Sequence, residues 1–207
     1  MLLIIDNYDS FTYILADYIL QQGCKVRIVR PANITINEIV KLAPRAAVIS
    51  SGSGYHGHAG IVVPLIKGLV GSIPLLGIGS GYLALAEVFG GNIVKADRPR
   101  HGKTAEIYHH GEGLFLGLPL PFRAACYHSL VVDSRVFPSV LEIAAFSATG
   151  EMMALKHRHY PVYGVQFHPA SILTEYGERI LKNFISMAGE FKLLLREEGG
   201  TEDGAYR

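Results

Sequence analysis

The sequence has no tryptophan, only two cysteines and no excess of charge of either sign. Cys24 and Cys126 lie far apart and fit no metal-ligand spacing, which argues against a cysteine-based zinc site or a disulfide scaffold. The net charge of +1, without a basic block, argues against nucleic acid as the main partner. No apolar run reaches the ~18 residues of a membrane span, and a charge already appears at Asp6. We therefore expect no membrane contact, no secretory signal and a cytoplasmic protein.

The chain has 207 residues, of which 49% are hydrophobic and 18% are charged. This length is enough to bury one hydrophobic core without a disulfide or a structural metal. In its first ninety residues, short apolar runs alternate with segments of helical period. Strand followed by helix in this rhythm predicts an open parallel sheet with right-handed crossovers. The expected strands are 2–5, 26–29, 46–49 and 75–78, and the expected helices are 11–19, 37–42, 61–70 (with Pro64 in its first turn) and 81–88.

After Asn92 the pattern changes to short β segments, and a last helix is expected over about 175–187. We expect one domain over 1–189, because no linker or repeat divides the chain, and a frayed polar tail over 190–207. The β segments are expected at 104–108, 122–126, 141–146, 152–155 and 162–166.

A glycine-rich strand–turn–helix lies at 77–83, with the sequence GIGSGYL. In open α/β sheets ligands bind beyond the carboxyl ends of the strands. A sharp turn at that place can expose one side chain and point backbone N–H groups at a developing oxyanion. The same spacing is also typical of a close helix–sheet contact.

Several segments of this chain match the motifs of one known protein family, in the same order and with the same spacing, from residue 1 to about 187. They are DNYDSFT at 6–12, FGG at 89–91, HGKT at 101–104, GLF at 113–115, YHSLVV at 127–132, GVQFHP at 164–169, SILT at 171–174 and KNF at 182–184. The chain resembles the class I (triad) glutamine amidotransferases, and most closely the glutaminase subunits of anthranilate synthase and aminodeoxychorismate synthase. The resemblance implies a flavodoxin-like α/β fold, with an open, mostly parallel twisted sheet flanked by helices and a smaller added β region.

In that family a cysteine on the turn attacks the amide of glutamine, a histidine acts as base, and a glutamate orients the histidine. The ammonia passes to a chorismate-utilising synthase, and no cofactor or metal takes part. Here Gly79 stands at the nucleophile position, His168 keeps the base, and Ala170 replaces the glutamate. Loss of one triad member typically removes ~10⁴–10⁶ in rate. The resemblance therefore predicts a chain that has lost glutaminase activity.

By the same resemblance, two further groups of residues have expected roles. The residues expected at the substrate pocket and oxyanion loop are Gly52, Ser53, Gly54, Ser80, Leu83, Tyr127, His128 and Ser129. The residues expected to contact the synthase are Asn7, Tyr8, Asp9 and Ser10. Within the pocket set, Leu83 replaces a glutamine of the family, and the oxyanion loop has lost both of its prolines. The loop at 101–104 is either a contact with the partner or a plain turn, and in the family this stretch lies near the substrate pocket.

Two substitute nucleophiles can be considered. Ser80 lies one residue too late on the turn and is not centred in a Gly-x-Ser-x-Gly frame, so we interpret it as a helix-start serine. Cys126 and His128 would share a face of a regular strand. A buried thiol is the simpler interpretation of Cys126.

Two histidine pairs, His56 with His58 and His157 with His159, have the spacing of a metal site. If the loop at 51–58 faces His168, three imidazoles could approach one another, and zinc takes three or four such ligands. Polar loop histidines are the simpler interpretation, and we expect no metal.

Three functional hypotheses remain at this point. The favoured one is a non-catalytic subunit that supports or regulates a chorismate-utilising synthase. The second is a pocket rebuilt for another reaction that uses His168, Tyr82, Ser80 or the loop histidines. The third is a sensor that binds a small molecule in the old pocket without turning it over.

Overall fold

The computed structural model describes the backbone of residues 1–52 and 55–199, and the side chains of residues 1–52 and 62–191. Its strands form one nine-stranded sheet in the order β2-β1-β3-β4-β9-β8-β7-β5-β6. The strands are β1 (Leu2–Ile5), β2 (Val26–Val29), β3 (Ala46–Ile49), β4 (Leu75–Ile78), β5 (Ile93–His109), β6 (Phe122–Val132), β7 (Leu141–Ser147), β8 (Met152–His157) and β9 (Val162–Val165). The helices are α1 (Thr12–Gln21), α2 (Ile36–Leu42), α3 (Tyr55–Leu69), α4 (Ser80–Val88) and α5 (Gly177–Gly199).

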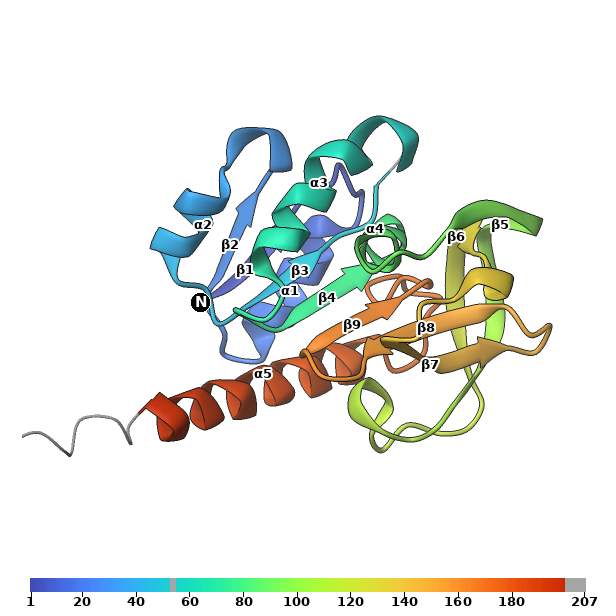
Figure 1. Cartoon of the computed structure of the whole chain (residues 1–207). Helices are drawn as coiled ribbons and strands as arrows, with labels where there is room; N and C mark the ends of the chain where they lie inside the picture. Colours follow the sequence, from blue (N-terminus) through green and yellow to red (C-terminus); the bar gives the residue numbers. More distant parts are fainter. Residues whose placement is uncertain (53–54, 200–207) are drawn as a thin grey trace, which may run out of the picture.

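The sheet combines a parallel half with an antiparallel half (Figure 1). β2, β1, β3 and β4 pair in parallel, as the strand–helix alternation predicts. β9, which was expected only as one of the later β segments, adds a fifth parallel strand beside β4. From β9 onward the pairing is antiparallel, through β8, β7, β5 and β6. The expected added β region is therefore an extension of the main sheet. The α/β class and the flanking helices are confirmed.

The two faces of the parallel half bury different side chains because successive residues of a strand point to opposite sides. Leu2 and Ile4 of β1 pack with α1 and α5, whereas Leu3 and Ile5 pack with α2, α3 and α4. A third apolar cluster joins Tyr82 of α4 to the antiparallel strands. The parallel half is thus covered by helices on both faces, and the carboxyl ends of its strands meet at one edge.

Two helix boundaries differ from the sequence prediction by more than two residues. α3 begins at Tyr55 rather than near Ile61, so Pro64 lies inside the helix and not in its first turn. The early glycine and histidine residues have low helical propensity, which hides this start. α5 continues to Gly199, so that residues 190–199 are helical where a frayed tail was expected. Residues 200–207 lie outside the described part.

Candidate functional site

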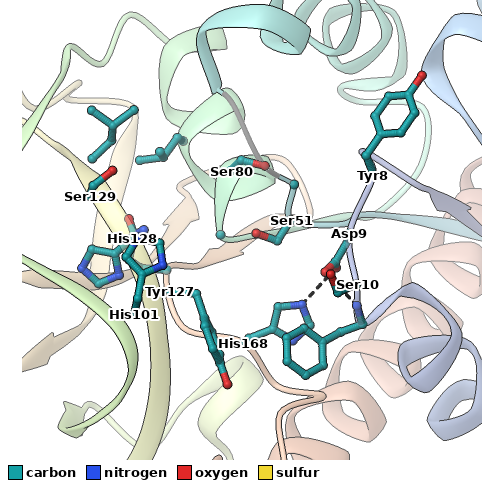
Figure 2. Close-up of a pocket in the computed structure, with 16 residues that line it drawn as sticks. Tyr8, Asp9, Ser10, Ser51, Ser80, His101, Tyr127, His128, Ser129 and His168 are labelled. Atoms are coloured by element: carbon teal, nitrogen blue, oxygen red, sulfur yellow. Dashed lines mark hydrogen bonds and ion pairs between the residues drawn. The ribbon is translucent and has the colours of Figure 1, made fainter.

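A cavity of about 440 Å³ opens at the carboxyl edge of the parallel strands (Figure 2). Its walls come from the segments that follow β1, β3, β4 and β9, and from β5 and β6 on the antiparallel side. This is the edge at which open α/β sheets bind ligands. The lining residues are Tyr8, Asp9, Ser10, Phe11, Ser51, Gly52, Gly79, Ser80, Leu83, His101, Tyr127, His128, Ser129, Leu130, Gln166 and His168.

The turn between β4 and α4, which we call the elbow (Gly77–Gly81), forms as the sequence predicts. Gly79 has φ of +56° and ψ of −110°, a conformation that only glycine adopts without strain. Its N–H donates to Val165 O of β9 at 2.9 Å. A Cβ on Gly81 would lie 2.3 Å from Ile49 O, so only glycine allows α4 to pack this closely on β3. The elbow keeps a sharp turn and presents no side chain at its apex.

Ser51 occupies the place where a side chain on Gly79 would project. A Cβ built on Gly79 would lie 2.3 Å from Ser51 Oγ and 2.9 Å from Ser51 Cβ. Real Cβ atoms essentially never approach other heavy atoms this closely. Sequence reasoning noted that the loop has serines in place of prolines, but it did not predict that one of these serines fills the space beside Gly79.

His168 lies in the segment after β9, and both of its ring nitrogens are engaged. The N–H of Ala170 donates to His168 Nδ1 at 3.2 Å, so this nitrogen carries a lone pair and Nε2 carries the proton. Nε2 then donates to Asp9 Oδ2 at 3.0 Å (dashed in Figure 2). The side chains of His168 and Asp9 are each 4% exposed. In this arrangement the imidazole has no free lone pair with which to accept a proton.

Asp9 is held by the turn that leads into α1. Its Oδ1 accepts from the N–H of Phe11 at 2.9 Å, and the ring of Phe11 lies 4.5 Å from that of His168. Among the residues expected to contact a synthase, Asn7 and the side chain of Asp9 are therefore turned inward, while Tyr8 and Ser10 are exposed. Asp9 is a partner of His168 that sequence reasoning had assigned to a different role.

The other predicted pocket residues lie around the cavity. Ser80 Oγ accepts a hydrogen bond from Asn7 Nδ2 at 3.1 Å. The neighbour of this hydroxyl is therefore an amide and not the imidazole that a serine nucleophile would need as its base. The hydroxyls of Tyr127 and Ser171 are 2.9 Å apart, and His128 Nε2 lies within ion-pair distance of Glu151. Gly52, Leu83, Ser129 and His101 also line the cavity, whereas Ser53 and Gly54 lie outside the described residues. Ala170 is buried among apolar side chains.

Gln166 is a cavity residue that sequence reasoning missed. It follows β9, is 2% exposed and lines the cavity. Within the described part of the chain, neither its Oε1 nor its Nε2 has a hydrogen-bond partner. Its place in the GVQFHP motif was noted without a role, and only the three-dimensional placement beside the elbow distinguishes it from a structural glutamine.

The substitute nucleophile and the histidine metal sites considered from the sequence find little support among the described residues. The Sγ of Cys126 contacts Ala124 O, and burial raises the pKa of this thiol to about 11, against a smaller opposing effect of Arg100. His157 Nδ1 accepts from the N–H groups of His159 and Tyr160, which occupies one of its two possible metal-binding nitrogens. The side chains of His56 and His58 lie outside the described residues. In the part of the chain that is described, no group of three or more potential ligands could hold a metal ion, and no helix is long and apolar enough to cross a membrane.

Comparison with known proteins agrees with this geometry. The family model "Glutamine amidotransferase class-I" matches residues 3–188. The aminodeoxychorismate/anthranilate synthase component 2 of Bacillus subtilis is 45% identical over 185 residues, which cover 89% of this chain and 95% of that protein. The bifunctional protein TrpGD of Thermotoga maritima is 46% identical over 187 residues, but the chain spans only 32% of its length.

Among solved structures, a putative GMP synthase subunit from Thermoplasma acidophilum superposes with a TM-score of 0.85 at 27% identity. The match covers 94% of this chain and 96% of that one. The extent of the family match, the identity to full-length component 2 proteins and the elbow at the sheet edge lead to one conclusion. The chain belongs to the class I glutamine amidotransferase family and is of the anthranilate and aminodeoxychorismate synthase component 2 type.

Proposed function

We propose that this chain is a non-catalytic amidotransferase subunit that supports or regulates a chorismate-utilising synthase. The observation that carries the proposal is the apex of the elbow, where Gly79 offers no nucleophile and Ser51 fills the space one would need. Covalent attack on an amide requires a nucleophilic atom at that apex. The family's route to ammonia therefore has no first step in this chain.

The state of His168 supports the same proposal independently. A general base must present a lone pair within hydrogen-bond reach of the proton that it takes. His168 accepts a hydrogen bond from the N–H of Ala170 at Nδ1 and donates one to Asp9 from Nε2–H. This pairing fixes the histidine as a link between the β1–α1 turn and the segment after β9, a structural role that needs no turnover.

Exposed apolar side chains near the site support a role in an assembly. Several large ones lie on α1 and on the segment that follows His168, among them Tyr13, Ile172 and Leu173. Ile172 is 96% exposed, so its whole side chain is available for burial against a partner. Relatives named component 2 of anthranilate or aminodeoxychorismate synthase suggest the class of partner, a chorismate-utilising synthase.

The experiment is to co-purify the tagged full-length chain from its native host and to assay the captured synthase. We expect a chorismate-utilising enzyme that makes its product with ammonium salts or needs no nitrogen donor, and that does not respond to glutamine. An Ile172→Asp variant should reduce the amount of captured synthase, and Val136→Asp, at another exposed apolar position, serves as the matched control. Glutamine-dependent product formation that the chain confers on the synthase would refute the proposal.

A further inference from the structure

A second cavity, of about 840 Å³, lies at the end of the sheet farthest from β2, where β5 and β6 pair (Figure 1). Its walls come from β5, from the end of β6 with the residues that follow it, and from the turn between β7 and β8. It shares no lining residue with the cavity at the elbow. Its volume is typical of a small-molecule site, and the proposed function makes no use of it.

An irregularity of β5 forms one wall of this second cavity. The pairing of β5 with β6 jumps from Lys95 to Arg100, so that residues 96–99 of β5 face a single residue of β6. In a regular strand Lys95 and Arg98 would point to opposite faces. Bulges redirect side chains in this way and are frequent beside functional sites. Here the bulge lets Lys95, Arg98 and Arg100 line the same cavity.

The turn between β7 and β8 closes the cavity from the opposite side. Nη2 of the half-buried Arg100 donates to Thr149 Oγ1 at 3.2 Å. Thr149 Oγ1 lies 3.0 Å from Ser147 Oγ, so the turn holds this hydroxyl in place. No other hydrogen bond of the Arg100 guanidinium is found among the described residues. Most of its N–H groups are therefore available to a ligand.

The carboxylates that line the cavity are already engaged by other groups. Asp133 accepts hydrogen bonds from Nε and Nη2 of Arg135, each at 2.9 Å. These bonds raise the pKa of Arg135, and Asp97 adds a smaller effect in the same direction. Glu151 lies within ion-pair distance of the buried His128. Each carboxylate of the cavity thus has a cationic or imidazole neighbour of its own.

Three cations of the cavity are left without a carboxylate. Within the residues whose side chains are described, Lys95, Arg98 and Arg100 form no ion pair. Cations that line one cavity repel one another, and a bound anion reverses the sign of this interaction. A monocarboxylate would offset only one of the charges. A phosphate group carries a charge of about −2 and offers acceptor oxygens that guanidinium groups bind bidentately.

We propose that this cavity binds a phosphate-bearing small molecule, whose phosphate groups are held by Lys95, Arg98 and Arg100. The hydroxyl of Thr149, beside Arg100, is placed to contact one of the phosphate oxygens. The bound molecule would connect the bulge of β5 to the turn between β7 and β8. The proposal is independent of the elbow and of the proposed function, because the two cavities have no lining residue in common.

The test uses the full-length chain and inorganic pyrophosphate as the probe, near neutral pH, without divalent cations and at constant ionic strength set with chloride. Calorimetry and thermal shift follow the binding. We expect saturable binding of pyrophosphate, and weaker binding of inorganic phosphate because it carries less charge. Acetate, a monoanion, should give no saturable response. A hexaglutamate peptide stands for an acidic protein segment and should bind more weakly than pyrophosphate.

Charge-removing substitutions locate the site. Arg98→Gln and Arg100→Gln should each raise the pyrophosphate Kd about tenfold, which corresponds to the loss of a charge-assisted hydrogen bond. Lys95→Gln should raise the Kd severalfold, and because Lys95 and Arg98 are exposed, their variants should fold like the wild type. Lys103→Gln is the matched control, since it removes the same charge from the same strand outside the cavity, and it should leave the Kd unchanged.

Several outcomes would overturn the inference: no saturable response to pyrophosphate, equal binding of acetate, tighter binding of hexaglutamate, or cavity variants whose Kd changes no more than that of Lys103→Gln. None of these outcomes bears on glutamine hydrolysis. Release of glutamate would overturn the proposed function whatever the pyrophosphate titration shows.

Discussion

At the scale of single residues, Gly79 and Ser51 form a complementary pair. Gly79 has no side chain, and the hydroxyl of Ser51 lies in the volume that a side chain there would fill. The glycine also removes the strain that any other residue would bear at φ of +56° and ψ of −110°. The elbow is thus relaxed in this chain.

The first prediction concerns this pair. Gly79→Ala should destabilise the chain by about 2–4 kcal/mol, since a strained backbone position costs about 1–3 kcal/mol and overpacking adds to it. In Ser51→Gly, the two side-chain atoms that a Cβ at position 79 would strike are gone. The double variant should therefore be more stable than the sum of the single effects predicts, by about 1 kcal/mol. Chemical denaturation of the four proteins measures this coupling, and strictly additive effects would contradict the packing described here.

Restoring the nucleophile alone should not restore activity. We expect Gly79→Cys to release no glutamate from glutamine, because His168 has both ring nitrogens engaged and Ser51 occupies the position of the thiol. The measurement is a coupled glutamate assay, with Ser51→Gly in the same background to remove the clash. Rapid hydrolysis by the single Gly79→Cys variant would show that His168 is free to act as base.

At the scale of elements, much of the parallel half could be predicted from the sequence. The runs at 2–5, 26–29, 46–49 and 75–78 are strands with those bounds. Three of them are apolar throughout because they are buried on both faces, whereas β2 at the edge of the sheet contains the exposed Arg27. The start of α3 could not be predicted, since its first turns are rich in glycine and histidine. The order of the antiparallel strands depends on long-range pairing, for which local periodicity contains no signal.

The packing of α4 gives a prediction at this scale. Gly81→Ala would place a Cβ against a backbone carbonyl of β3, which cannot move aside without breaking the sheet. We expect a loss of about 3 kcal/mol, at the upper end of overpacking costs. Gly68→Ala in α3 is the matched control. Its new Cβ would lie 2.7 Å from Cδ1 at the end of the Ile36 side chain, which can rotate away, and the change adds up to about 1 kcal/mol of helix propensity. Equal effects of the two changes in thermal or chemical unfolding would argue against the close contact at the elbow.

At the scale of the whole molecule, the fold brings together groups that the sequence keeps far apart. Asp9 and His168 are 159 positions apart and are joined because β1 and β9 end at the same edge of the sheet. The pairing could not be predicted, since neither residue's neighbours indicate it: His168 was expected to be the base, and Asp9 was expected to contact the synthase. The same holds for Gln166, whose amide has no partner among the described residues, a feature that only the assembled strands show.

The central claim is that this chain does not hydrolyse glutamine, and the most direct measurement is glutamate release at saturating glutamine with the captured synthase present. Wild type should be indistinguishable from His168→Ala, because a base without a nucleophile contributes nothing to the rate. Glutamate release by the wild type that His168→Ala abolishes would contradict this claim.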